Sequence, residues 1–127
     1  MSLRSPLGKV LGLGAAKEGV KHWWSQRVTA IALALLGGWF IGSLFLLGNF
    51  DYATVVAWIR NPYDAALLVL FIATLAYHSL LGVQVVIEDY VAGALKTAAI
   101  VVSNFLHVGV SVLGILAVLR IAFGSAP

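Results

Sequence analysis

The chain has 127 residues, of which 61% are hydrophobic and 10% are charged, and its mean hydropathy is +1.01. A water-soluble domain of this length could not hide so much apolar surface, because small globular proteins bury too small a fraction of their chain. The net charge of +3 gives no reason to expect nucleic-acid binding. The absence of cysteine excludes disulfides, iron–sulfur ligation and thiolate metal sites within this chain.

Three apolar stretches, at about residues 28–48, 65–87 and 98–123, predict an all-α integral membrane protein with three transmembrane helices. Each stretch is long enough to cross a hydrocarbon core about 30 Å thick. The first starts only after Arg27 and continues for about 20 residues, whereas the apolar part of a signal peptide has about 7–15, so we expect a retained span. Pro62 is expected to open the second span. Residues 1–27 are then an N-terminal segment on the inner side, and residues 28–127 are a membrane anchor domain that forms part of a heteromeric helical bundle.

The charges around the first stretch predict the orientation of the chain. One acidic residue, Glu18, precedes that stretch. The basic residues before the stretch are more numerous: Arg4, Lys9, Lys17, Lys21 and Arg27. Positive charge stays on the inner side, which places the N-terminus in the cytoplasm of a bacterial inner membrane, with the matrix side of a mitochondrial inner membrane as the alternative. Three spans then put the 88–97 loop on that same inner side.

His78 lies near the middle of the second stretch, where hydrocarbon offers no water to solvate an imidazole. The ring therefore needs a metal, an internal hydrogen bond or a proton path. Haem iron accepts neutral imidazole, and a b-type haem in a bilayer commonly takes two axial nitrogens from facing helices. Gly82, one turn later, lacks a side chain where a flat macrocycle would need clearance. From the residues alone, a haem ligand and a histidine hydrogen-bonded to a neighbouring helix are equally open.

Asp89 and Tyr90 close the second stretch at the membrane edge. The eleven residues from His78 to Asp89 correspond to a rise of roughly 16 Å and return to nearly the same helix face. A phenol can hold a quinone carbonyl, and a carboxylate at the boundary can supply protons when the quinone is reduced. An ordinary polar helix end is the alternative. Arg27 lies at comparable depth, where it can pair with Asp89, hold a haem propionate or reach lipid phosphate.

His107, in the third stretch, suggests a rival arrangement. It follows Lys96 by eleven residues, so in an antiparallel hairpin it would lie at the depth of His78. A self-contained cytochrome with haem between His78 and His107 is therefore one alternative. Ser103 and Asn104 favour a different interpretation, a hydrogen-bonding face between helices. A structural anchor without haem is also possible, whereas a proton-coupled transporter is disfavoured because no Asp or Glu lies within the three stretches.

Two segments resemble the small hydrophobic membrane anchor of succinate dehydrogenase (respiratory complex II), in its alphaproteobacterial and mitochondrial form. They are residues 22–30 (HWWSQRVTA) and 78–91 (HSLLGVQVVIEDYV). The resemblance implies a subunit that is not catalytic alone and that serves a succinate:quinone oxidoreductase. The flavoprotein and iron–sulfur subunits of such an enzyme dock on the inner face of the membrane.

The resemblance also implies roles for individual residues. His78 would be an axial ligand of haem b, with the second axial histidine supplied by the sister cytochrome b anchor subunit. Tyr90 and Asp89 would bind ubiquinone, and Arg27 would lie near the haem propionates. The family does not require His107.

Overall fold

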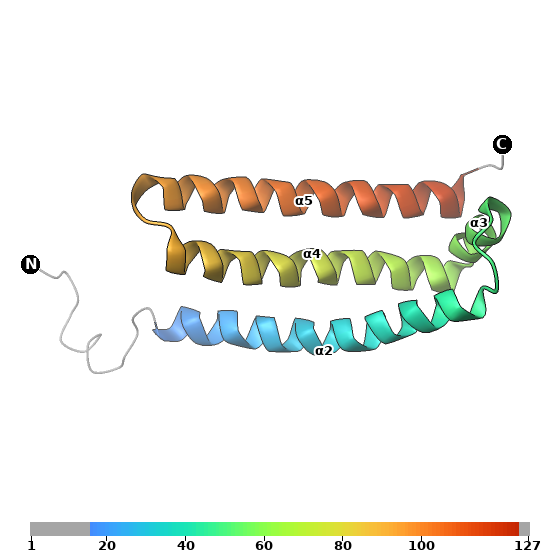
Figure 1. The fold of residues 1–127 in the computed structure, drawn as a ribbon, viewed down its shortest axis with the longest axis horizontal. Helices are drawn as coiled ribbons and strands as arrows, with labels where there is room; N and C mark the ends of the chain where they lie inside the picture. The colour runs from blue at the N-terminus through green and yellow to red at the C-terminus, as the bar shows by residue number, and fades with distance from the viewer. Residues whose placement is uncertain (1–15, 125–127) are drawn as a thin grey trace, which may run out of the picture.

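The computed structural model describes residues 16–124, and the side chains of residues 19–124. This part of the chain forms four helices and no strand: α2 (Ala16–Leu46), α3 (Tyr52–Arg60), α4 (Pro62–Tyr90) and α5 (Gly93–Phe123) (Figure 1). Three of them are long and apolar enough to cross a membrane: an 18-residue segment has a mean hydropathy of 2.0 within Gly19–Leu46 and of 2.1 within both Pro62–Tyr90 and Gly93–Phe123. The prediction of an all-α, multi-pass membrane protein is confirmed.

The helices extend beyond the apolar stretches that predicted them. Helix α2 begins at Ala16 rather than near residue 28, so it includes part of the predicted N-terminal segment. Hydropathy marks where the hydrocarbon ends, but a helix continues into water until its hydrogen bonds are capped or broken. Residues 1–15 of that segment, with Arg4 and Lys9, lie outside the described residues.

The connection between the first two spans contains a short helix, α3, that hydropathy did not predict. The Asp51 side chain caps it by accepting a hydrogen bond of 2.8 Å from the Thr54 N–H. The Asn61 side chain likewise caps α4 by accepting from the Tyr63 N–H at 2.9 Å, and Pro62 is the first residue of that helix, as predicted. The starts of α3 and α4 are thus set by short-range polar capping, which a search for apolar stretches does not detect.

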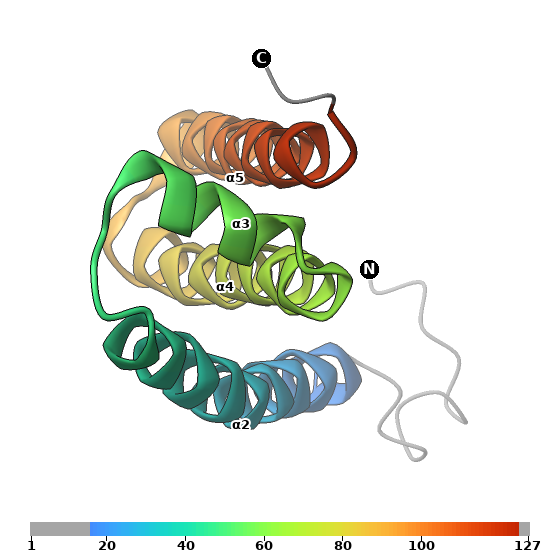
Figure 2. The same cartoon turned by 90° about the vertical axis from the view of Figure 1, so that its right-hand side faces the viewer.

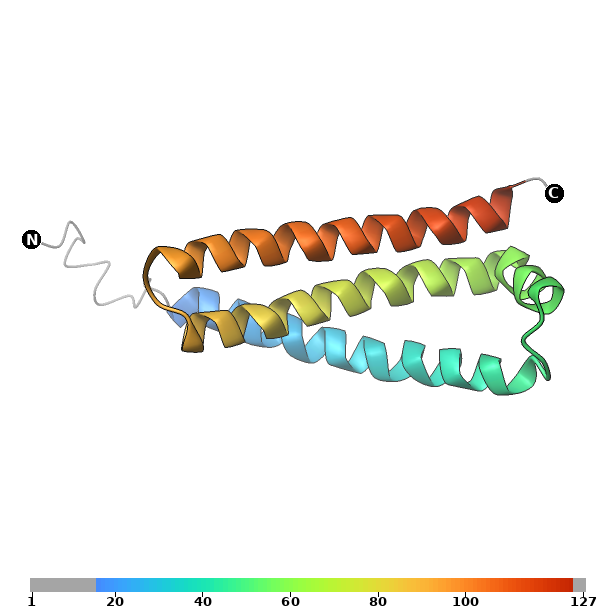
Figure 3. The same ribbon diagram turned by 45° about the horizontal axis from the view of Figure 1, so that its top comes forward.

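Helix α4 is the middle member of a row of three. Helices α2 and α5, as far as the structure describes them, each pack against α4 and do not contact each other (Figures 1 and 3). Few of the described side chains are buried: Ala65, Leu68, Leu81, Ser103 and Val118. The row therefore has two separate helix interfaces, α2/α4 and α4/α5, and leaves wide apolar faces to lipid or to other subunits.

The two ends of the row are built differently. At one end, α3 lies across the tips of α4 and α5, and we call this the α3 end (Figure 2). Trp39 and Phe40 of α2 pack there on Trp58 of α3 and Phe71 of α4, with ring centres 5.2–6.1 Å apart for the interhelical pairs. At the other end, the turn between Tyr90 and Gly93 joins α4 to α5 beside the first turns of α2, and we call this the turn end (Figure 1). The candidate site residues lie between the middle of the row and the turn end.

Candidate functional site

The half-buried His78 ring points from α4 toward α2 and makes polar contacts with two α2 side chains. Its Nδ1 lies 2.9 Å from Thr29 Oγ1, and its Nε2 lies 3.4 Å from the amide nitrogen of Gln26. The first distance is a good hydrogen bond, and the second is long for one. The structure thus places the imidazole between two helices, with one nitrogen firmly held and the other in weak contact.

The α2 partners belong to a polar stripe. His22, Gln26 and Thr29 follow one another at helical spacings of four and three residues, so they share one face of α2. Neither Gln26 nor Thr29 was singled out as a site residue from the sequence. The signal that would have found them is this polar stripe in a helix that is otherwise apolar, on the side that must face another helix.

A cavity of about 730 Å³ lies next to this contact, between α2 and the last turns of α4. Its lining is Gly19, His22, Trp23, Gln26, Gly82, Gln84, Val85 and Glu88. Two buried atoms of this lining, His22 Nε2 and Gln26 Oε1, have no hydrogen-bond partner among the described residues. Leaving a buried polar atom unpaired costs about 1–3 kcal/mol, so the cavity lining is incomplete within residues 16–124.

Gly82 faces this region from α4. A Cβ atom built there would lie 3.6 Å from the Gln26 amide nitrogen, which is an ordinary contact. Packing within the described part of the chain therefore does not require glycine at this position. A longer side chain would fill the space that the glycine leaves beside Gln26 and the His78 ring.

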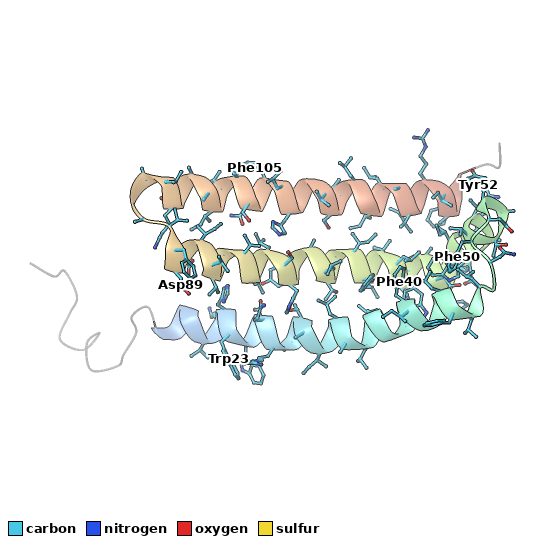
Figure 4. All side chains as sticks on the ribbon, in the orientation of Figure 1. Trp23, Phe40, Phe50, Tyr52, Asp89 and Phe105 are labelled. Atoms are coloured by element: carbon cyan, nitrogen blue, oxygen red, sulfur yellow. The ribbon has the colours of Figure 1, made fainter. Side chains whose placement is uncertain are left out.

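Asp89 and Tyr90 are the last residues of α4 and lie exposed at the turn end, where Figure 4 labels Asp89 at the same end of the row as Trp23. Tyr90 is 85% exposed. The turn beyond them is fixed by Lys96, whose Nζ donates to the Glu88 carbonyl at 2.7 Å. The structure thus puts His78, Asp89 and Tyr90 on one helix in the expected order and leaves the last two open to other molecules.

Arg27 is exposed, and its guanidinium carbon lies 5.4 Å from the centre of the Trp23 ring. Such a cation–π contact at an exposed site contributes about 0.5–1 kcal/mol. The cavity lining between α2 and α4 includes Trp23 but not Arg27. Arg27 therefore does not line the cavity beside His78, although Gln26, its neighbour in the chain, does.

His107 lies in the other interface, and both of its ring nitrogens have protein partners. Nδ1 lies 2.8 Å from the Ser103 carbonyl oxygen, and Nε2 lies 3.1 Å from Ser79 Oγ on α4. The predicted hydrogen-bonding face between helices is thus present, with Ser103 in it and Asn104 exposed. His78 faces α2 while His107 bonds to the other side of α4, and no group of three or more His, Cys, Asp or Glu able to hold a metal occurs in residues 16–124. This part of the chain gives no sign of a cytochrome built from these two histidines.

Comparison with known proteins identifies the family of the chain. The model of the succinate dehydrogenase/fumarate reductase transmembrane subunit family matches residues 1–119. The chain belongs to this family. A succinate dehydrogenase hydrophobic membrane anchor subunit from Rickettsia bellii is 36% identical over 89 residues, which cover 70% of this chain and 71% of the relative. The protein of the same name from Paracoccus denitrificans is 29% identical over 114 residues, 90% of this chain and 88% of the relative.

A third relative is the succinate dehydrogenase membrane anchor subunit from Reclinomonas americana. It is 32% identical over 88 residues, which cover 67% of this chain and 73% of the relative. No solved structure matches the chain. Family membership and three apolar helices identify a membrane anchor subunit of succinate dehydrogenase, which confirms the resemblance noted in residues 22–30 and 78–91.

Proposed function

We propose that this membrane anchor binds haem b through His78 and contributes Tyr90 and Asp89 to a ubiquinone site, in a complex that transfers electrons from succinate to quinone. The observation that carries the proposal is the His78 ring at mid-span, held at Nδ1 and weakly contacted at Nε2, beside a cavity with unpaired polar atoms in its described lining. A histidine whose only role was to join two helices would be expected to have both nitrogens satisfied, as His107 has.

The residues around His78 suit a haem group. Neutral imidazole is a haem ligand, Gly82 carries no side chain one turn along α4, and the apolar helices would keep water away from the group in a bilayer. The contact between the Gln26 amide nitrogen and His78 Nε2 is long, at 3.4 Å, and the Gln26 amide oxygen has no partner within residues 16–124. Little therefore holds the Gln26 side chain in place. When bound, haem would supply a one-electron carrier. A second histidine ligand would come from the sister cytochrome b anchor subunit, since His107 faces the other interface and cannot supply it.

The turn end suits a quinone site at a boundary between subunits. Tyr90 is exposed there and would donate its phenolic proton to a quinone carbonyl, while Asp89 would pass protons from water to the reduced quinone. Arg27 lies on α2 near the same end and would meet a haem propionate or a lipid phosphate. The iron–sulfur and flavoprotein subunits would dock at this end, on the cytoplasmic side of a bacterial inner membrane, as the basic residues before the first span predict.

The test is a pair of histidine variants in the complete complex. His78→Ala should remove the haem while the subunits still co-purify, because it takes away a ligand. His107→Ala should keep the haem, because that ring bonds only to Ser79 and Ser103 among the described residues. Haem is quantified from the reduced-minus-oxidised spectrum per flavin. A His78→Ala complex with a full, unaltered haem spectrum would refute the ligand assignment.

The same preparations test the quinone residues. Tyr90→Phe should slow succinate-driven quinone reduction and leave the haem spectrum unchanged, because it removes one hydroxyl at the turn end. Tyr63→Phe, at the exposed start of α4, is the matched control and should leave both unchanged. Equal quinone reduction rates in the two variants would remove Tyr90 from the site.

A further inference from the structure

The Thr29 hydroxyl makes three polar contacts that together fix where its proton points. Its oxygen lies 2.7 Å from the Ser25 carbonyl oxygen, 3.2 Å from the Gln26 carbonyl oxygen and 2.9 Å from His78 Nδ1. A hydroxyl has one proton to donate and lone pairs to accept with, whereas a carbonyl oxygen can only accept. The short contact with Ser25 therefore takes the proton, and Thr29 Oγ1 accepts at His78.

This assignment determines the tautomer of His78. Because Thr29 accepts, the hydrogen on the neutral ring is on Nδ1, and Nε2 carries the lone pair. The Gln26 amide group agrees, because its NH₂ is the part that lies toward Nε2, at 3.4 Å, and an NH₂ can only donate. The Nε2 lone pair thus points at a side chain that contacts it weakly and lies in the lining of the cavity.

We infer that Thr29 is a positioning residue for His78, which selects the tautomer and the ring orientation that present the Nε2 lone pair to the haem iron. The inference rests on the proposed haem ligation. Histidine ligands of metals typically donate their second ring N–H to a fixed acceptor, which sets the tautomer and raises the basicity of the ligating nitrogen. Here the acceptor is a hydroxyl of the neighbouring helix in the same chain, so the packing of α2 on α4 controls the ligand.

A purely structural role for Thr29 makes different predictions. Threonine often returns its hydroxyl proton to a carbonyl one turn earlier in a transmembrane helix, which accounts for the Ser25 contact alone. That role needs no acceptor at His78 and would leave the electronic properties of a bound haem unchanged. A measurement on the haem itself therefore separates the two roles.

The experiment compares threonine variants in the complete, haem-loaded complex. Thr29→Val keeps the shape and removes the acceptor, Thr29→Ser keeps the acceptor, and Thr74→Val makes the same chemical change on α4 one turn from His78. We expect Thr29→Val to weaken haem retention by about 10- to 100-fold, the usual cost of losing such a partner. The haem midpoint potential should also become more positive, because a less basic imidazole stabilises ferric iron less. A tenfold loss confined to ferric haem equals about 59 mV for one electron.

The outcomes distinguish the positioning role of Thr29 from haem ligation by His78. Thr29→Ser and Thr74→Val should keep the potential and the low-spin spectrum of the unaltered complex. If Thr29→Val behaves like Thr74→Val while His78→Ala loses the haem, the positioning role is wrong and the ligand assignment stands. If His78→Ala keeps the haem, the ligand assignment itself is wrong. Should the valine variant not assemble, Thr29→Ala removes the same acceptor with a smaller side chain and must give the same positive shift.

Discussion

The two interfaces of α4 each hold a histidine and a hydroxyl side chain, but only one of them is complete. In the α4/α5 interface, His107 donates from Nδ1 to a carbonyl at 2.8 Å and accepts at Nε2 from Ser79 at 3.1 Å. In the α2/α4 interface, His78 has one good bond and one long contact, and neighbouring buried atoms have no partner in the described part of the chain. A polar residue within a span is thus not by itself a sign of function. The informative sign is a group of polar side chains in which some atoms lack a hydrogen-bond partner within the described part of the chain.

The largest expected effect comes from filling the incomplete interface. Gly82→Leu should abolish most haem binding, because a side chain starting 3.6 Å from the Gln26 amide would extend into the space beside His78. Haem per flavin in the purified complex measures the effect. Gly109→Leu on α5 is the control, since no described atom beyond its chain neighbours and the nearby backbone of its own helix lies within 4 Å of a Cβ there. Normal haem content in Gly82→Leu would show that the space beside Gln26 is not used.

A smaller effect is expected from breaking the complete interface. Ser79→Ala removes the hydroxyl that donates to His107 and should lower the free energy of unfolding by about 0.6 kcal/mol, with about 1.7 as the upper end for such bonds in membranes. Titration of the detergent-solubilised complex with a denaturing detergent gives the change, and the haem spectrum should stay as it was. Ser43→Ala on α2 serves as the reference. A haem loss in Ser79→Ala would contradict the separation of the two interfaces.

The smallest effect concerns packing alone. A Cβ at Gly114 would lie 3.3 Å from Ile72 Cγ2, tighter than most such contacts. A Cβ at Gly38 would have no described atom within 4 Å beyond its chain neighbours and the nearby backbone of its own helix. Both changes to alanine gain the same helix propensity, so their difference isolates packing between α4 and α5. We expect Gly114→Ala to be less stable than Gly38→Ala by up to about 1 kcal/mol, because the flexible Ile72 side chain can shift. Equal stabilities in the same titration would mean that the interface adapts without cost.

The sequence was sufficient for the three spans, for Pro62 as the start of the second, and for a hydrogen-bonding face at Ser103 and His107. It was not sufficient for the partner of His78. Apolar residues lie on every side of α4 around that ring, and the few polar ones, such as Thr74 and Ser79, form no amphipathic pattern that indicates which side meets α2 and which meets α5. The existence of α3, a helix of nine residues, was missed for another reason. Capping by Asp51 and Asn61 acts over a few residues, below the length scale of a hydropathy window.

The lack of contact between the described lengths of α2 and α5 has a consequence for how the protein is put together. Separating α2 from α4 would leave the α4–α5 hairpin, with its Ser79–His107 bond, undisturbed. The aromatic rings of α2, α3 and α4 gather at the α3 end, so this cluster attaches α2 at the end far from His78. If α2 swung about that attachment, the His78 ring would be uncovered, and the proposed haem could then enter after the chain had reached the bilayer.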